Sequence, residues 1–207
     1  MTYKSVIIRI IRLTVSAYYA HKFYILLLLH GIHVKGYTAG PHHNQGGGGS
    51  NFLCLPEEPQ WKTYLDGYST FAGGIAGVEY ALFNSEHEWA NSPFTEANNG
   101  GKPLLAKPVS CAVCHVAGRS IILMVPAKTQ CPDGWTTEYA GYLGSDAVHD
   151  YNRKRSSYVC LDEAPEIAGD ETLHWQAVIL VVEVTCGILP CSAYINGREL
   201  TCVVCSK

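Results

Sequence analysis

The chain contains the stretch Cys111-Ala112-Val113-Cys114 and repeats its pattern near the other end as Cys202-Val203-Val204-Cys205. In both stretches the cysteines flank apolar residues that include valine, which is typical of a buried β-strand rather than of a helix. A Cys-x-Val-Cys pattern that recurs in this way indicates two related halves, because internal repeats mark repeated structural units.

Two further stretches recur in the same order ahead of each Cys-x-Val-Cys. A Gly-Tyr stretch occurs at Gly36-Tyr37-Thr38-Ala39-Gly40 and again at Gly141-Tyr142-Leu143-Gly144-Ser145. An apolar-Cys-Leu stretch followed by acidic residues occurs at Leu53-Cys54-Leu55-Pro56 and again at Val159-Cys160-Leu161-Asp162. Three matches in one order favour a duplication over chance.

The composition favours strands joined by tight turns. The 207 residues include 13 Tyr, 20 Gly and 10 Pro but only 2 Met, and aromatic residues suit a pleated sheet while Gly and Pro suit turns. Charged residues make up 16% of the chain and the net charge is −3, without the basic cluster that binds nucleic acid. We predict an all-β fold of two related, disulfide-stapled antiparallel halves, residues 36–114 and 115–207, and no nucleic-acid partner.

Nine cysteines lie between Cys54 and Cys205. That number exceeds what a reduced cytosolic protein usually carries, and the recurrent spacing is typical of a disulfide framework in a secreted protein. The alternative is a four-thiolate zinc site formed by the two Cys-x-x-Cys pairs, which would leave the other five cysteines unexplained. We expect disulfides, an oxidising extracellular location, and no metal or other cofactor.

Residues 1–35 form an atypical amino-terminal segment that is both basic and apolar. Its apolar runs are interrupted by four basic residues, Lys4, Arg9, Arg12 and Lys22. A secretory signal has an uninterrupted apolar centre, and the apolar run at residues 23–29 is shorter than the roughly 20 residues that cross a bilayer. The segment is interpreted as an imperfect signal peptide or signal anchor, as a wrong gene start, or as a membrane-surface helix. A membrane partner is expected only if it is an anchor.

A resemblance to a known family is carried by Cys131-Pro132-Asp133-Gly134-Trp135, together with the Gly-Tyr, Cys-Leu and Cys-x-Val-Cys stretches. This series resembles the duplicated non-collagenous C-terminal domain of type IV collagen. The stretches from Asn51 to Pro56 and from Gly197 to Cys205 look more like the spongin-type short-chain collagens. The resemblance covers about residues 35–207. The chain has no Gly-x-y run, so it cannot itself wind a collagen triple helix.

The resemblance implies a disulfide pattern. In the collagen domain the Cys of Cys-Pro pairs with the second Cys of the closing motif, the Cys of Cys-Leu pairs with the first, and a short local loop is closed by its own pair. Carried over, this pattern implies four disulfides: Cys131 with Cys205, Cys160 with Cys202, Cys186 with Cys191, and Cys54 with Cys111. It leaves Cys114 outside any disulfide, because the matching partner would lie upstream of Gly36.

Several polar residues are candidates for surface interactions. His42 and His43 precede a glycine run that lacks the Gly-Lys-Ser/Thr ending of a phosphate-binding loop, so a surface turn is expected there. Glu57 and Glu58 have acidic equivalents at Asp162-Glu163 and would suit calcium or glycoside hydrolysis, although adjacent acids at a proline turn usually face water. Arg198 is expected on a hairpin turn beside the last strand, with an integrin-type or carbohydrate contact as its functional alternative.

The sequence contains no nucleophile motif such as Gly-x-Ser-x-Gly. We therefore do not expect an enzyme, and a hydrolase is the least favoured hypothesis. By the resemblance, the chain is expected to be a structural and interaction protein of the extracellular matrix. It would associate with other matrix proteins or with itself. The alternative is a secreted lectin-like carbohydrate-binding module that uses its aromatic residues Trp61, Tyr64, Tyr68 and Trp89.

Overall fold

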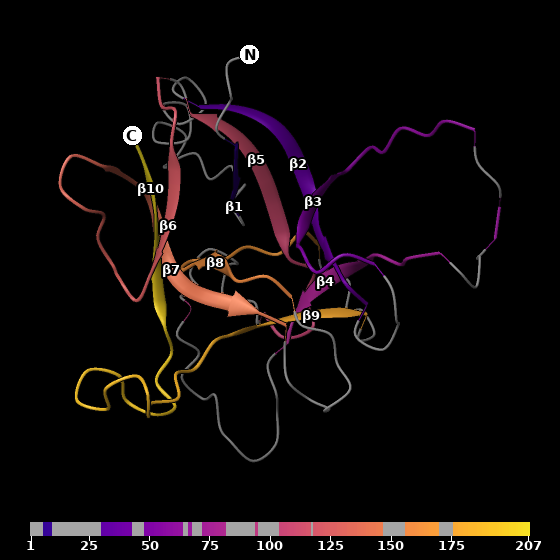
Figure 1. Cartoon of the computed structure of the whole chain (residues 1–207). Helices are drawn as coiled ribbons and strands as arrows, with labels where there is room; N and C mark the ends of the chain where they lie inside the picture. The colour runs from indigo at the N-terminus through magenta and orange to yellow at the C-terminus, as the bar shows by residue number, and fades with distance from the viewer. Residues whose placement is uncertain are drawn as a thin grey trace.

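The computed structural model describes residues 6–9, 30–42, 48–63, 66–67, 72–81, 94, 104–116, 118–146, 156–169 and 176–207. Every regular element within these ranges is a β-strand (Figure 1), so the all-β class predicted from the sequence is confirmed. The same ranges contain no helix that is long and apolar enough to pass through a bilayer.

The described ranges contain ten strands that form one curled, mixed sheet. The strands are β1 (Val6–Arg9), β2 (His30–Gly40), β3 (Leu53–Pro56), β4 (Ala76–Tyr80), β5 (Ser110–Val116), β6 (Ile122–Pro126), β7 (Thr136–Ser145), β8 (Val159–Asp162), β9 (Ala177–Val181) and β10 (Thr201–Ser206). Their order is β1-β5-β2-β4-β9-β7-β10-β6, with β3 paired to β2 and β8 paired to β7. β4 and β9 are parallel, and they join a first group, β1 to β5, to a second group, β6 to β10 (Figure 1).

The central strands of the two groups, β2 and β7, pair with their neighbours in the same registers. Gly36 of β2 lies opposite Cys111 of β5, and Gly141 of β7 lies opposite Cys202 of β10. The pairing of β2 with β3 matches that of β7 with β8, as shown by the opposed residues Tyr37 and Leu55 in the first group and Tyr142 and Leu161 in the second. We call residues at the same place in the two groups counterparts.

Irregular features match as well. On β2 the register with β5 skips His33, and on β7 the register with β10 skips Glu138. Each skip marks a β-bulge, which inserts one extra residue and bends the strand. Backbone hydrogen bonds inside each group also repeat. Tyr80 N donates to Lys107 O in the first group, and Val184 N donates to Arg198 O in the second, at 3.0 Å each. A further matched pair is Val109 N to Val78 O and Leu200 N to Val182 O, at 2.9 Å each.

The amino-terminal strand follows the same plan. β1 pairs with β5 so that Ile7 lies opposite Cys114, and β6 pairs with β10 so that Leu123 lies opposite Cys205. β2 begins at His30, so this strand runs across residue 35, where the sequence suggested the end of an atypical segment. Residues 10–29 lie outside the described ranges.

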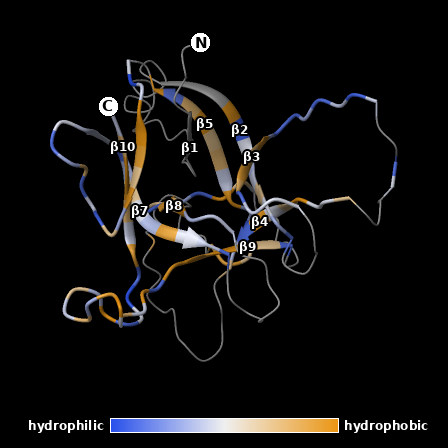
Figure 2. Cartoon of the chain, viewed as in Figure 1, coloured by the Kyte–Doolittle hydropathy of each residue, from blue (hydrophilic) through white to orange (hydrophobic). Residues whose placement is uncertain are grey.

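The main core lies where the two groups meet. Its buried side chains come from both groups: Phe52, Val78, Tyr80, Phe94, Leu104 and Val109 from the first, and Leu161, Ala177 and Ile179 from the second. A smaller cluster is formed mainly by second-group residues, among them Tyr139, Leu143 and Val204, and it also includes Val116 of β5. Figure 2 shows hydrophobic residues, in orange, along β5 and β6. The largest core is therefore an interface between the groups.

Ala106 stands at a backbone position that suits glycine. Its φ is 54°, in the left-handed region, and its counterpart is Gly197 with a φ of 71°. A Cβ in this region costs about 1–2 kcal/mol. Glycine removes that cost, but its greater freedom in the unfolded chain cancels part of the gain in stability. We expect Ala106→Gly to raise the free energy of unfolding in urea by about 0.5–1 kcal/mol. The matched control, Ala112→Gly in β5, should lower the free energy of unfolding. A loss of stability in Ala106→Gly would contradict the left-handed backbone conformation of Ala106.

Candidate interaction surface

Four disulfides fasten the described strands, and they join the pairs that the collagen resemblance implied: Cys54–Cys111, Cys131–Cys205, Cys160–Cys202 and Cys186–Cys191. These bridges include three of the four cysteines of the Cys-x-Val-Cys motifs, Cys111, Cys202 and Cys205. The two motifs therefore do not supply four thiolates to zinc. The described residues contain no group of three or more His, Cys, Asp or Glu side chains that would hold a metal ion.

Two of the disulfides span a central strand. Cys54–Cys111 links β3 to β5 on either side of β2, and Cys160–Cys202 links β8 to β10 on either side of β7, with Cα–Cα distances of 5.6 and 5.7 Å. Strands on either side of a third are normally about 9.5 Å apart. β3 and β8 therefore fold over their central strands.

Glycine permits this close crossing. A Cβ on Gly36 would lie 1.8 Å from the carbonyl oxygen of Leu55, and a Cβ on Gly141 would lie 1.8 Å from that of Leu161. No side chain fits at either place. The Gly of each Gly-Tyr stretch is thus a steric requirement of the disulfide crossing beside it.

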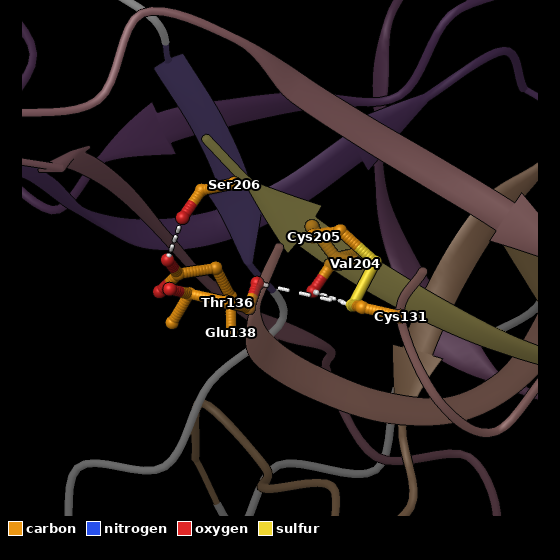
Figure 3. Close-up of a disulfide and its surroundings, with 6 residues drawn as sticks. All are labelled: Cys131, Thr136, Glu138, Val204, Cys205 and Ser206. Carbon is orange, nitrogen blue, oxygen red and sulfur yellow. Dashed lines mark hydrogen bonds between the residues drawn. A yellow bond between two sulfur atoms is a disulfide. The ribbon is translucent and has the colours of Figure 1, made fainter. Parts of the chain in front are cut away.

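The Cys131–Cys205 disulfide pins the start of the second group to its last strand (Figure 3). Cys131 Sγ lies 3.8 Å from the carbonyl oxygens of Thr136 and Val204; because a disulfide sulfur has no proton to donate, these are packing contacts. Beside it, the bulge residue Glu138 accepts a hydrogen bond from Ser206 Oγ (Figure 3). The bulge and the bridge together fix the register of β7 against β10.

Cys114 is the counterpart of Cys205. It lies on β5, it is buried, and it belongs to none of the four disulfides. Among the described residues, the first group therefore has one bridge across its central strand and none equivalent to Cys131–Cys205.

The second group docks onto the first through the connection between β8 and β9. Ile167 forms an isolated bridge with Val109, and Ala168 N donates to Pro108 O at 2.9 Å. The carbonyl oxygen of Glu166 accepts hydrogen bonds from Tyr80 OH and Ser110 Oγ, both at 3.1 Å. Pro165, in the same connection, is fully buried.

Tyr80 anchors this contact as a neutral donor. Burial, with smaller contributions from the carboxylates of Asp162 and Glu166, raises the pKa of its phenol. A buried hydrogen bond of this kind contributes about 1–2 kcal/mol. We expect Tyr80→Phe to lower the free energy of unfolding by that amount in a denaturant titration. Tyr158→Phe, which removes a hydroxyl from an exposed ring, is the control, and equal effects in the two variants would refute the anchoring role.

The polar residues singled out in the sequence are spread over the surface. Glu57 forms an ion pair with Lys35 at 3.0 Å, and Glu58 is exposed. Arg198 is exposed beside the turn at Asn196-Gly197, whose Asn196 side chain accepts a hydrogen bond from Cys186 N. His42 is half-buried, and His43 lies outside the described residues. In the described part of the chain these residues do not come together as one site.

The paired acids of the second half serve local structure. Asp162 Oδ1 accepts a hydrogen bond from Ala164 N at 3.0 Å, which closes the turn after β8, while Glu163 is exposed. Of the four aromatic residues suggested for sugar binding, Trp61 is exposed, and Tyr64, Tyr68 and Trp89 lie outside the described residues.

An exposed apolar face lies on β2 and β3, and the sequence did not single it out. Tyr37 and Leu55 are opposed across the two strands, and Leu53 shares their face because alternate residues of a strand point the same way. All three are exposed, as are Trp61 and Ile75 in the connection that follows β3. The alternating pattern of these residues in the sequence fits a buried strand equally well, so exposure could not be derived from it.

No protein-family model matches the chain, and no solved structure matches it.

Proposed function

We propose that this chain is a non-enzymatic structural and interaction protein of the extracellular matrix, resembling the C-terminal domain of short-chain collagens. It acts by associating with other matrix proteins or with itself. The four disulfides support secretion, because such bridges persist in oxidising compartments and are rare in the cytosol. The equal registers of the two strand groups support an origin by internal duplication, with the two halves as copies of one unit.

The apolar face of β2 and β3 carries this proposal. Tyr37, Leu53 and Leu55 are exposed together, and apolar patches on a soluble domain mark contact sites for other proteins. The Cys54–Cys111 disulfide links β3 to β5 across β2, so it holds β3 against the strand that bears Tyr37. A surface fixed in this way loses little conformational freedom on binding, which favours affinity.

Matrix deposition tests the proposal. The full chain, secreted from cultured cells behind a cleavable signal, is expected in the detergent-insoluble matrix outside the cells, with its disulfides formed. Leu55→Asp should shift it to the culture medium, whereas the matched variant Ile121→Asp, which changes an exposed isoleucine elsewhere, should not. Recovery of the unmodified chain in the medium alone, as a soluble protein, would refute the proposal.

Exposure of Trp61 favours one second candidate, a lectin-like module, because an exposed aromatic ring offers an apolar face on which a sugar stacks. A glycan array of the secreted chain decides it. Hits that Trp61→Ala abolishes would support carbohydrate binding. An array without hits would remove the candidate.

A further inference from the structure

The connection between β9 and β10 contains the pair Asn196-Gly197, whose side-chain and main-chain groups can react with each other. The pair lies in the gold-to-yellow segment that extends away from the strands at the lower left of Figure 1, and both residues are exposed. Asparagine is a chemically labile residue, because the main-chain nitrogen of the next residue can attack its side-chain amide. Glycine, which lacks a Cβ, obstructs that attack least.

The pair occupies the centre of a tight turn. Arg198 N donates a hydrogen bond to Ile195 O at 3.1 Å, which closes a β-turn around Asn196 and Gly197. The φ of Gly197 is 71°, in the left-handed region that the third residue of a type II turn adopts. The turn therefore fixes the main chain on both sides of the bond that joins the two residues.

Hydrogen bonds restrain both reacting groups. Asn196 Oδ1 accepts a hydrogen bond from Cys186 N at 2.7 Å, and Gly197 N donates one to Val184 O at 2.9 Å. Both partners belong to the segment that the Cys186–Cys191 disulfide closes. Because the Asn196 amide carbon must move onto Gly197 N for reaction, these hydrogen bonds oppose it. The disulfide limits how far the segment can open.

We propose that Asn196 is a site of spontaneous deamidation and that the Cys186–Cys191 disulfide controls its rate. This modification goes beyond the proposed function and does not depend on it. The intact bridge keeps the turn closed and the reaction slow. Opening of the bridge by a thiol reductant frees the turn and speeds the reaction.

The reaction needs only water. Gly197 N forms a bond to Asn196 Cγ, the bond from Cγ to Nδ2 breaks, and ammonia leaves with the proton that Gly197 N has lost. The product is a five-membered succinimide ring. Water then opens the ring at either carbonyl, which gives aspartate or isoaspartate at position 196. No group is oxidised or reduced. Loss of the nitrogen's proton assists the attack, so the rate should rise with pH.

The products change the turn in two ways. Each puts a carboxylate in place of a neutral amide, two residues before the exposed Arg198. Isoaspartate also adds one carbon to the main chain, which displaces Gly197 and Arg198 relative to Val184. Gly197 N donates to Val184 O, and Val184 N donates to Arg198 O, so isoaspartate weakens the pairing that leads into β10.

Peptide mapping of the oxidised protein, incubated at mildly alkaline pH, tests the site. Aspartate and isoaspartate should accumulate at position 196. Asn51 is the internal control, because it is also exposed but is followed by Phe52, whose side chain hinders the attack; it should stay unchanged. Asn196→Gln should also stay unchanged, since glutamine would have to close a larger ring. Conversion at Asn196 no greater than at Asn51 would overturn the proposal.

Rate comparison tests control by the disulfide. The Cys186→Ala, Cys191→Ala protein, shown to be folded by its urea transition, should react at Asn196 about 10-fold faster than the unmodified protein, because the hydrogen bonds of the turn open more easily. The reduced chain in guanidinium chloride gives the unrestrained rate, which should be faster still. Equal rates in the unmodified and disulfide-free proteins, or in the native and unfolded chains, would overturn control by the bridge.

Discussion

Alanine at Gly36 or Gly141 is expected to abolish stable folding of the strand group that contains it. The added Cβ would lie 1.8 Å from a backbone oxygen, of Leu55 in one case and Leu161 in the other. Backbone atoms cannot rotate away as a side chain can, so β3 or β8 would have to leave its central strand. We expect a loss of more than about 3 kcal/mol in the free energy of unfolding, measured in urea.

Gly77→Ala is the matched control, since Gly77 also lies in a strand and a Cβ there meets no atom within 4 Å. Its free energy of unfolding should stay within about 1 kcal/mol of that of the unmodified protein. Gly36→Ala and Gly141→Ala proteins as stable as this control would show that β3 and β8 do not fold over their neighbours.

Removal of the Cys160–Cys202 disulfide is also expected to have a large effect. The bridge spans 42 residues, and closing a loop of that length restricts the unfolded chain by about 4 kcal/mol. Both cysteines are buried, so their loss also disturbs packing. The Cys160→Ala, Cys202→Ala protein should therefore unfold at a much lower urea concentration than the unmodified protein.

The comparison is the Cys186–Cys191 bridge, which spans 5 residues in an exposed loop. Its removal by Cys186→Ala and Cys191→Ala should cost only about 2 kcal/mol, because a short loop has little freedom to lose. Equal losses from the two removals would argue against Cys160–Cys202 as a main support of the second group.

The sequence was most informative where chemistry is local. Cys-x-Val-Cys, Gly-Tyr and Cys-Leu each combine a residue of special chemistry with β-forming neighbours, and the structure brings Gly141, Cys160 and Cys202 together at one crossing. A disulfide framework and an all-β class followed from cysteine number and turn residues. These features depend on the residues themselves rather than on what packs over them.

The sequence was least informative about contacts between the groups. Leu55 and Leu161 occupy matched strands, yet one is exposed and the other buried, because only the second has another group of strands over it. The parallel pairing of β4 with β9 likewise depends on the whole chain rather than on either strand's pattern. The apolar face of β2 and β3 was missed for this reason.

Non-reducing peptide mapping would show whether matched disulfides hold the two strand groups. The oxidised protein is digested without reduction after alkylation, and linked peptides are identified by mass. We expect four linkages: Cys54 to Cys111, Cys131 to Cys205, Cys160 to Cys202, and Cys186 to Cys191. A peptide in which Cys111 is bonded to Cys114, or closing cysteines that are all alkylated, would contradict it.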